Sequence, residues 1–175
     1  VIAREENVYC MVNPAPAADL SRSFYRQVDL LTPNESELGL LAGMPTEVPA
    51  AWRTAGHRLL DLGLQTLLVT LGVDGSLAMD SQSELHLPAY KVKMLDSTAA
   101  GDCFNGALAA GIDALVEARG RTRDRLVLTP GDLAPMIDRA TRAAAMSVTR
   151  QGAQPSIPWR EEVDGFDSWY PQHSS

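Results

Sequence analysis

The stretch from 96 to 107 carries the residue types best suited to phosphate chemistry. It reads Asp-Ser-Thr-Ala-Ala-Gly-Asp-Cys-Phe-Asn-Gly-Ala, a turn of small and hydroxyl-bearing residues that leads into the spacing of a helix over 100–115. The backbone N–H groups that open a helix lie at the positive end of its dipole and favour an anion. Asp102 would lie in the first helical turn beside that anion, where a carboxylate can take the proton of an attacking hydroxyl. Taken alone, an ordinary capped helix with an acidic first turn explains the same pattern.

A second candidate pair, Asn34 and Glu37, follows a short predicted strand at 28–31. Pro33 breaks that strand, and Asn34 is expected to cap a helix that Gly43 ends. Residues three apart share one helix face, so a capping box explains the pair and is favoured on local evidence. Because Mg²⁺ keeps several waters and takes few protein carboxylates, Glu37 could also act on a metal ion through water.

A third candidate is the turn Thr-Leu-Gly-Val-Asp-Gly at 70–75. It overlaps the end of a continuous apolar run at 66–71, of the kind that is buried on both faces of a sheet. Ligands of open parallel sheets lie beyond the carboxyl ends of the strands, so this turn is well placed to hold a nucleotide. The same residues are also a plain turn between strands, and a pair of glycines is weak evidence by itself.

The elements that must position these residues alternate between strand and helix, which predicts an α/β fold with a mostly parallel sheet. Short adjacent strands between 76 and 95 predict an antiparallel hairpin at one edge. The predicted strands cover 8–13, 28–31, 66–71 and 76–79, and the predicted helices cover 24–28, 34–41, 48–62, 100–115, 130–149 and 157–163. The arginine-rich run at 119–125 is expected to be a solvated loop between two helices.

Length and composition are those of a globular domain. A chain of 175 residues is expected to form one domain with a sizeable core, and its 45% apolar and 21% charged residues are ordinary values. The net charge of −7 argues against a broad nucleic-acid surface. Cys10 and Cys103 lack metal-binding spacing and are expected to be reduced thiols in a cytoplasmic protein. No apolar run is long enough to cross a membrane, so no membrane partner is expected.

Together, the three motifs resemble those of the ribokinase family of carbohydrate kinases. The resemblance rests on Gly-Asp within 96–107, on Asn-x-x-Glu at 34–37 and on Thr-Leu-Gly-x-x-Gly at 70–75. Asn-Pro-Ala-Pro-Ala at 13–17 and Val-Thr-Arg-Gln-Gly-Ala-Gln-Pro-Ser at 148–156 narrow it to the ribose-phosphorylating branch. The resemblance implies a ribokinase-like three-layer α/β/α fold. It also implies transfer of the γ-phosphate of ATP to the primary 5-hydroxyl of D-ribose.

The resemblance also assigns roles to residues of this chain. Asp102 would be the catalytic base, and the amides of Ala99, Ala100 and Gly101 would form the anion hole. Two of those positions hold Ala where many family members have Gly, which leaves the chemistry plausible because backbone amides make the hole. The residues implied to hold the nucleotide and Mg²⁺ are Asn34, Glu37, Thr70, Leu71, Gly72, Val73, Asp74, Gly75, Gly101 and Asp102. The residues implied to hold K⁺, several through backbone oxygen, are Asp96, Thr98, Ser147, Arg150, Gly152 and Ser156.

The resemblance runs from about residue 8 to 166 but matches only the carboxyl-terminal half of a family member. The motifs of the amino-terminal half, which grips the sugar and supplies a lid that commonly dimerises, are not found in this chain. We therefore expect 1–175 to be the nucleotide-binding and catalytic portion of an enzyme that is a homodimer at full length. By itself, this portion is not expected to phosphorylate ribose. Another sugar or nucleoside kinase of the superfamily, or a non-catalytic nucleotide-binding fragment, are the alternatives.

Overall fold

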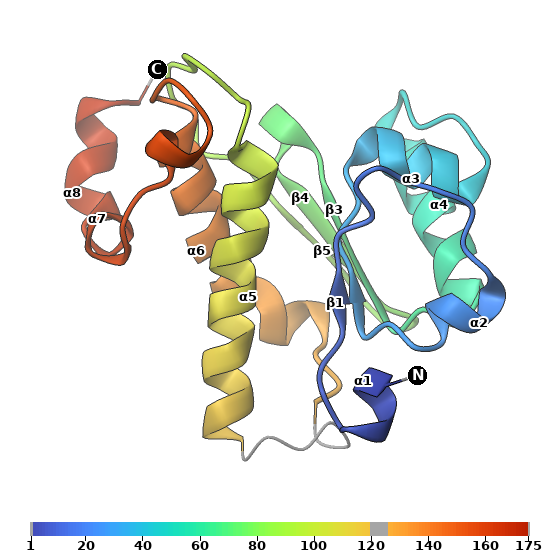
Figure 1. Cartoon of the computed structure of the whole chain (residues 1–175). Helices are drawn as coiled ribbons and strands as arrows, with labels where there is room; N and C mark the ends of the chain where they lie inside the picture. The colour runs from blue at the N-terminus through green and yellow to red at the C-terminus, as the bar shows by residue number, and fades with distance from the viewer. Residues whose placement is uncertain (1, 120–125, 175) are drawn as a thin grey trace.

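The computed structural model describes residues 2–119 and 126–174, in which five strands form one mixed sheet (Figure 1). The strands lie in chain order: β1 (Met11–Val12), β2 (Leu30–Leu31), β3 (Thr66–Thr70), β4 (Ser76–Met79) and β5 (Glu84–Leu87). The first three pair in parallel, while β3, β4 and β5 pair antiparallel. The predicted hairpin at one edge is confirmed, and it ends at Leu87. In the following segment, Val92 makes an isolated bridge with Ser174.

Helices cover both faces of this sheet. Successive side chains of a strand point to opposite faces, and β3 shows the consequence. Leu67 and Val69 pack with α2 (Arg22–Tyr25), α3 (Glu35–Ala42) and α4 (Pro49–Asp61), whereas Leu68 packs with α5 (Ala100–Ala118) and α6 (Pro130–Ser147). Figure 1 shows these two groups of helices on opposite sides of the sheet. The predicted three-layer α/β/α arrangement is therefore confirmed.

The remaining short elements lie at the two ends of the chain and in turns. They are α1 (Ile2–Glu5), α7 (Arg160–Asp164), α8 (Phe166–Trp169) and the 3₁₀ turns η1 (Gly72–Asp74), η3 (Gln154–Ser156) and η4 (Tyr170–Gln172). Both α7 and α8 pack on α5 and α6 through a third core that contains Cys103, Met146 and Phe166. Among the described residues, no helix combines the length and the apolar character that a membrane crossing requires.

Two short helices differ from their predicted positions. The Ser21 hydroxyl accepts a hydrogen bond from the Phe24 amide, so α2 begins at Arg22 and not at residue 24. The Glu162 carboxylate accepts a hydrogen bond of 2.8 Å from the Trp159 amide, so α7 begins only after that residue and Pro158 lies ahead of the helix. Both differences arise because a side chain caps a different amide from the one that the apolar spacing suggests.

The predicted arginine-rich loop falls mostly outside the described part of the chain. Its first residue, Arg119, lies at the end of α5 and forms an ion pair of 3.3 Å with Asp132 in the first turn of α6. The expectation for 120–125 lies outside the described residues.

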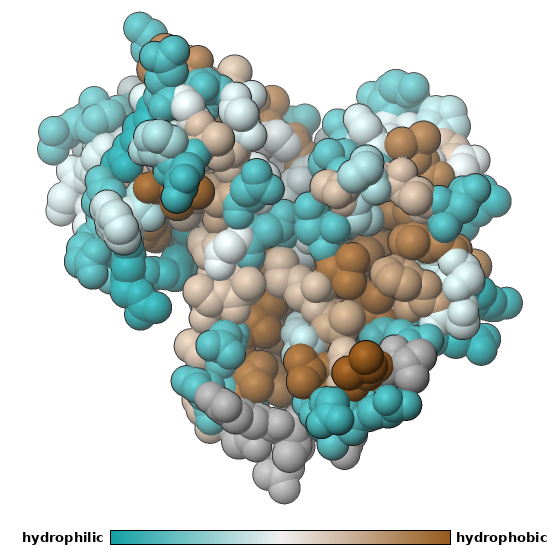
Figure 2. Space-filling view, in the orientation of Figure 1, coloured by the Kyte–Doolittle hydropathy of each residue, from teal (hydrophilic) through white to brown (hydrophobic). Residues whose placement is uncertain are grey.

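The sheet has an open edge at β1. This strand pairs with β2 on one side, and no other strand of the described residues pairs with it. Near it, Val8 is 54% exposed and Ile2 is 74% exposed. Figure 2 shows apolar surface over β1 and α1 in the same region. An unpaired edge flanked by exposed apolar side chains is a surface that further polypeptide ordinarily covers.

Candidate active site

The first turn of α5 leaves backbone donors available, as an anion site requires. The Ala100 amide donates to the Ser97 carbonyl at 3.1 Å, and the Cys103 amide donates to the Ala99 carbonyl at 2.8 Å. Within residues 2–119 and 126–174, the amides of Ala99, Gly101 and Asp102 make no backbone hydrogen bond. A Cβ built on Gly101 would meet no atom within 4 Å, so the space beside this turn is open.

Asp102 points away from the core. Its side chain is exposed and makes no hydrogen bond or ion pair with any other described residue. It borders a groove of about 470 Å³ between α5 and α7, which Gly106, Ala110 and Arg160 also line. A carboxylate that no neighbour holds is free to accept a proton from a bound hydroxyl. Asp102 thus lies in the first turn of α5, as expected, and its role as a base remains a prediction.

A network of hydrogen bonds around Asp96 joins the segment before α5 to the loop after α6. One carboxylate oxygen accepts hydrogen bonds from the amide and the hydroxyl of Thr98, at 2.9 and 2.5 Å. The other accepts a hydrogen bond of 2.9 Å from the Gly152 amide. The Leu95 and Asp96 amides both donate to the Val148 carbonyl. These contacts bring together two segments that lie more than fifty residues apart in the sequence.

These hydrogen bonds stabilise the ionised form of Asp96. They hold its pKa below the ordinary value of 3.8, with the Thr98 hydroxyl as the largest cause. The stabilisation that these contacts give to the fold is therefore present above pH 3.8 and is lost as the pH falls through the lowered pKa.

We expect carbon-detected NMR titration of the Asp96 carboxyl to give a pKa below 3.8. Replacement of Thr98 by Val removes the hydroxyl donor but keeps the amide donor, so the Asp96 pKa should rise. The Asp96 assignment would be contradicted by a wild-type carboxyl that titrates at or above 3.8 and does not respond to the Thr98→Val change.

Three other side chains implied to hold K⁺ are paired with neighbours in α6, in the loop after it and in α7. The Ser147 hydroxyl donates to the Ala144 carbonyl, and the Ser156 hydroxyl donates to the Ala153 carbonyl. The Arg150 guanidinium forms an ion pair of 2.6 Å with Glu162. Among the described residues, no group of three or more His, Cys, Asp or Glu side chains is arranged to hold a metal ion.

Asn34 and Glu37 form the reciprocal hydrogen bonds of a capping box. The Glu37 amide donates to Asn34 Oδ1 at 2.9 Å, and the Asn34 amide donates to Glu37 Oε2 at 2.8 Å. Asn34 also makes an isolated parallel bridge with Thr70, and the Thr70 amide donates to the Pro33 carbonyl. The pair thus lies beside the turn at 70–75. The cap is confirmed, and the metal role remains a prediction.

The turn at 70–75 is a tight loop that requires glycine. The Leu71 amide donates to the Gly75 carbonyl at 2.8 Å, and both Gly72 (φ +57°) and Gly75 (φ +89°) have positive φ. Nε2 of His86, in β5, donates a hydrogen bond of 2.7 Å to the Asp74 carbonyl. Figure 1 shows this turn and the start of α5 at the same end of the molecule.

A small hollow, which no sequence motif indicates, lies beside this turn. It measures about 210 Å³ and is lined by residues 87–90 and by Asp138 and Thr141 of α6. The turn touches its wall, because a Cβ added to Gly75 would lie 2.0 Å from the Leu87 carbonyl oxygen. The segment that forms this wall continues directly into Asp96 and the start of α5.

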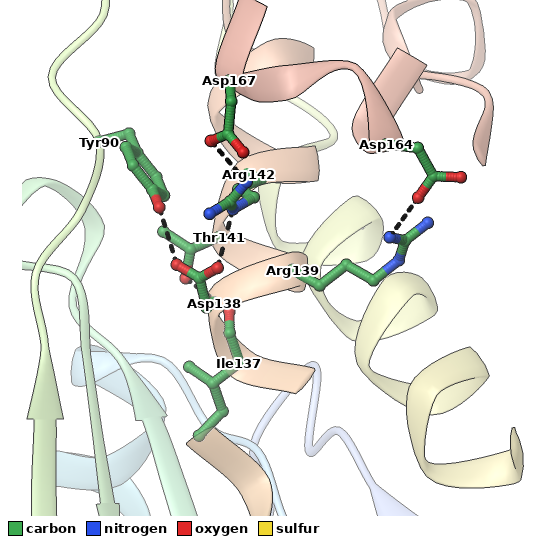
Figure 3. A network of polar contacts seen from close by, with 8 residues as sticks. All are labelled: Tyr90, Ile137, Asp138, Arg139, Thr141, Arg142, Asp164 and Asp167. Atoms are coloured by element: carbon green, nitrogen blue, oxygen red, sulfur yellow. Dashed lines mark hydrogen bonds and ion pairs between the residues drawn. The ribbon is translucent and has the colours of Figure 1, made fainter. Parts of the chain in front are cut away.

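A polar network holds the wall of the hollow in place (Figure 3). The Tyr90 hydroxyl donates to Asp138 Oδ1 at 2.8 Å, and Arg142 pairs with Asp138 Oδ2 at 2.8 Å. Arg142 also pairs with Asp167 of α8 and lies 5.7 Å from the centre of the Tyr90 ring. In the sequence, only the four-residue spacing of Asp138 and Arg142 hints at this network, since Tyr90 lies 48 residues away from Asp138.

Known proteins match this chain in sequence and in fold. Residues 1–160 match the pfkB family of carbohydrate kinases. Staphylococcus aureus ribokinase is 34% identical over 163 residues, which are 93% of this chain and 49% of that protein. Salmonella typhi deoxyribokinase is 33% identical over 164 residues, again 93% of this chain and 49% of that protein. The structure of Arabidopsis thaliana ribokinase complexed with ribose and ATP matches with a TM-score of 0.75 at 26% identity. That match covers 93% of this chain and 48% of the Arabidopsis chain.

The family match includes every candidate site residue, from Asn34 to Ser156. The chain spans about half the length of the curated relatives that it matches. The sequence match and the fold agree with one another. The chain therefore belongs to the pfkB family of carbohydrate kinases.

Proposed function

We propose that this chain supplies the nucleotide-binding and phosphoryl-transfer part of an ATP-dependent kinase that converts D-ribose to ribose 5-phosphate. The observation that carries the proposal is the position of Asp102. Its carboxylate is exposed in the first turn of α5, beside amides that have no backbone partner in the described residues. An acceptor for a proton and donors for an anion are thus adjacent, as phosphoryl transfer to an alcohol requires.

In the proposed reaction, Asp102 accepts the proton of the sugar 5-hydroxyl as that oxygen bonds to the γ-phosphorus of ATP. The bond from this phosphorus to the oxygen that bridges it to the β-phosphate breaks, and ADP leaves. The Ala99 and Gly101 amides would stabilise the negative charge on the transferring group. The Ala100 amide would join them only by giving up its hydrogen bond to Ser97.

The nucleotide phosphates would lie between the start of α5 and the turn at 70–75. Asn34 and Glu37 border that turn and offer oxygen atoms, which are the ligands that Mg²⁺ prefers. Their capping bonds leave further lone pairs on both side chains, so the residues fit an ion held directly or through water. When bound, Mg²⁺ supplies positive charge that offsets the charge of the phosphates.

We also propose that K⁺ binds where 96–98 meets 147–156. Asp96 and Thr98 supply side-chain oxygens, and the loop from Ser147 to Ser156 supplies carbonyls. When bound, K⁺ adds positive charge near the start of α5. The residues of this chain keep the two segments joined through the Asp96–Gly152 and Val148 contacts described above.

The hollow lined by 87–90 and α6 is proposed to take the base of the nucleotide. Its volume of about 210 Å³ suits a single ring system and is smaller than the pocket of a whole drug-sized ligand. The backbone of 87–89, which lines it, lies against Gly75 of the turn at 70–75, and the chain continues from this lining to Asp96 and α5. A base held there would leave its phosphates free to extend along that end of the sheet.

The open edge at β1 supports a second part of the proposal, that complementary polypeptide packs there and completes the sugar site. The relatives are about twice as long as this chain. The exposed Val8 and Ile2 and the unpaired strand are features that the remaining half of such a domain would cover. We therefore expect the 175-residue chain alone to bind nucleotide but not to phosphorylate ribose.

A second candidate substrate is 2-deoxyribose. The identity to Salmonella typhi deoxyribokinase, 33%, is nearly equal to the 34% identity to Staphylococcus aureus ribokinase. Both sugars present the same primary hydroxyl, so the chemistry proposed for Asp102 is the same for each. Residues that contact the sugar would decide between them.

The test combines binding and turnover. Calorimetric titration with Mg·ATP should show nucleotide binding to the chain, and absence of binding would contradict the proposal. Release of ADP would then be measured with ribose, 2-deoxyribose and a nucleoside. It should appear only when the part of the Staphylococcus aureus relative that this chain does not cover is added. Ribose-dependent release by the chain alone would show that no complementary half is needed. ATP binding without any transfer, even with that half, would favour a non-catalytic module.

A further inference from the structure

The side chains that α6 contributes to the hollow beside β5, Asp138 and Thr141, are suited to accept hydrogen bonds rather than to donate them. The Thr141 hydroxyl already donates to the Ile137 carbonyl at 2.8 Å, so its oxygen has only lone pairs left to offer. The Asp138 carboxylate receives one hydrogen bond on each oxygen, from Tyr90 and from Arg142. A carboxylate has about four lone-pair sites, so it can accept more.

The net charge of the side chains around the hollow also favours one kind of ligand. Asp138 and Asp167 share the single guanidinium of Arg142, which leaves the three side chains with a net negative charge (Figure 3). A phosphate would be repelled from the hollow, whereas an uncharged group with N–H donors would be attracted. The rest of the lining, from Leu87 to Ala89, is apolar and suits the flat face of a ring.

We infer that Asp138 is a specificity-determining residue, whose carboxylate selects a nucleotide with an exocyclic amino group on its base. This inference rests on the proposed function, because it assumes that the hollow holds the base of the phosphate donor. Tyr90 and Arg142 act as positioning residues: they hold the carboxylate, which lines the hollow, through one hydrogen bond on each oxygen.

The expected discrimination follows from the hydrogen bond that the half-buried Asp138 carboxylate would make with one base and not with the other. Adenine presents an amino group with two N–H donors. The base of purine riboside triphosphate carries hydrogen at the same position and has no donor to offer. Loss of a hydrogen bond to a charged group should weaken binding by roughly 10-fold or more.

The test compares calorimetric affinities of the 175-residue chain for Mg·ATP and for the magnesium complex of purine riboside triphosphate. The wild-type chain should favour ATP by roughly 10-fold. Replacement of Asp138 by Asn removes the negative charge and turns one of the two acceptor oxygens into a donor, so this ratio should fall towards unity. Tyr90→Phe keeps the carboxylate but removes one of the two contacts that fix it, so the preference should fall to a value between those of the wild-type chain and Asp138→Asn. Glu161→Gln is the matched control: it removes an exposed carboxylate of α7 that does not line the hollow, and the preference should not change.

The outcomes separate this inference from the function on which it rests. If the wild-type chain binds both nucleotides equally, the role of Asp138 is wrong while nucleotide binding stands. If neither nucleotide binds, the proposed function and the inference both fail. Should Asp138→Asn not fold, as judged by circular dichroism, the two-ligand comparison on the wild-type chain still decides the matter.

Discussion

Replacement of Asp102 by Asn is expected to slow phosphoryl transfer by about 10²–10⁴-fold, the usual contribution of a general base. Asn has nearly the same shape as Asp but cannot accept the proton of the sugar hydroxyl. Nucleotide affinity should change little, because the side chain makes no contact that organises the described fold. The measurements are ADP release with ribose in the complemented preparation, and calorimetric ATP affinity of the same variant.

Asp113→Asn is a matched control for this prediction. Asp113 is also an exposed carboxylate of α5, but it lies three turns away from the start of the helix. Its replacement should leave the rate unchanged, which would show that loss of a negative charge on α5 is not the cause. Normal turnover by Asp102→Asn together with lost ATP affinity would contradict the assignment of a base.

Replacement of Gly75 by Ala is expected to be the most destabilising single change in the nucleotide turn. A Cβ there would lie 2.0 Å from the Leu87 carbonyl oxygen and 2.7 Å from the Pro88 carbonyl carbon, both of them backbone atoms. Neither can move without displacing β5. The positive φ of +89° adds backbone strain. We expect a loss of about 3–5 kcal/mol in the free energy of unfolding, measured with urea, together with weakened ATP binding.

Gly72→Ala separates strain from collision in the same turn. Gly72 also has a positive φ, of +57°, but a Cβ added there would meet no atom within 4 Å. The free energy of unfolding should therefore fall only by the cost of the left-handed conformation, about 1 kcal/mol. Equal effects of the two substitutions would show that contact with the Leu87–Pro88 backbone does not hold the turn in place.

The fold could be predicted from the sequence where local chemistry and tertiary packing agree. Asn34, Glu37 and Gly43 specify a helix by their types and spacing, and α3 begins and ends at the expected residues. The alternation of strands and helices likewise predicts the three layers. The start of α7 was predicted too early, because the hydrogen bond from the Trp159 amide to Glu162 decides it and apolar spacing does not show that bond.

The candidate site could be predicted in part for the same reason. Asp102 lies on a helix whose start is readable, so its exposure at the first turn followed from the sequence. The hydrogen bond from the Ala100 amide to Ser97 depends on the exact path of the turn and could not be foreseen. The hollow beside β5 depends on contacts between Tyr90 and Asp138, which only the packing of the 88–95 segment against α6 brings together.

The most direct test of the account is to locate the terminal phosphate of the nucleotide by NMR. The ¹⁵N-labelled chain would be titrated with Mg·ADP and, separately, with a magnesium complex of a non-hydrolysable ATP analogue. We expect the amides of Ala99, Gly101 and Asp102 to shift with the triphosphate and to respond little to the diphosphate. The turn at 70–75 should respond to both. Equal responses at the start of α5, or none there with either nucleotide, would contradict the placement of the phosphoryl-transfer site beside Asp102.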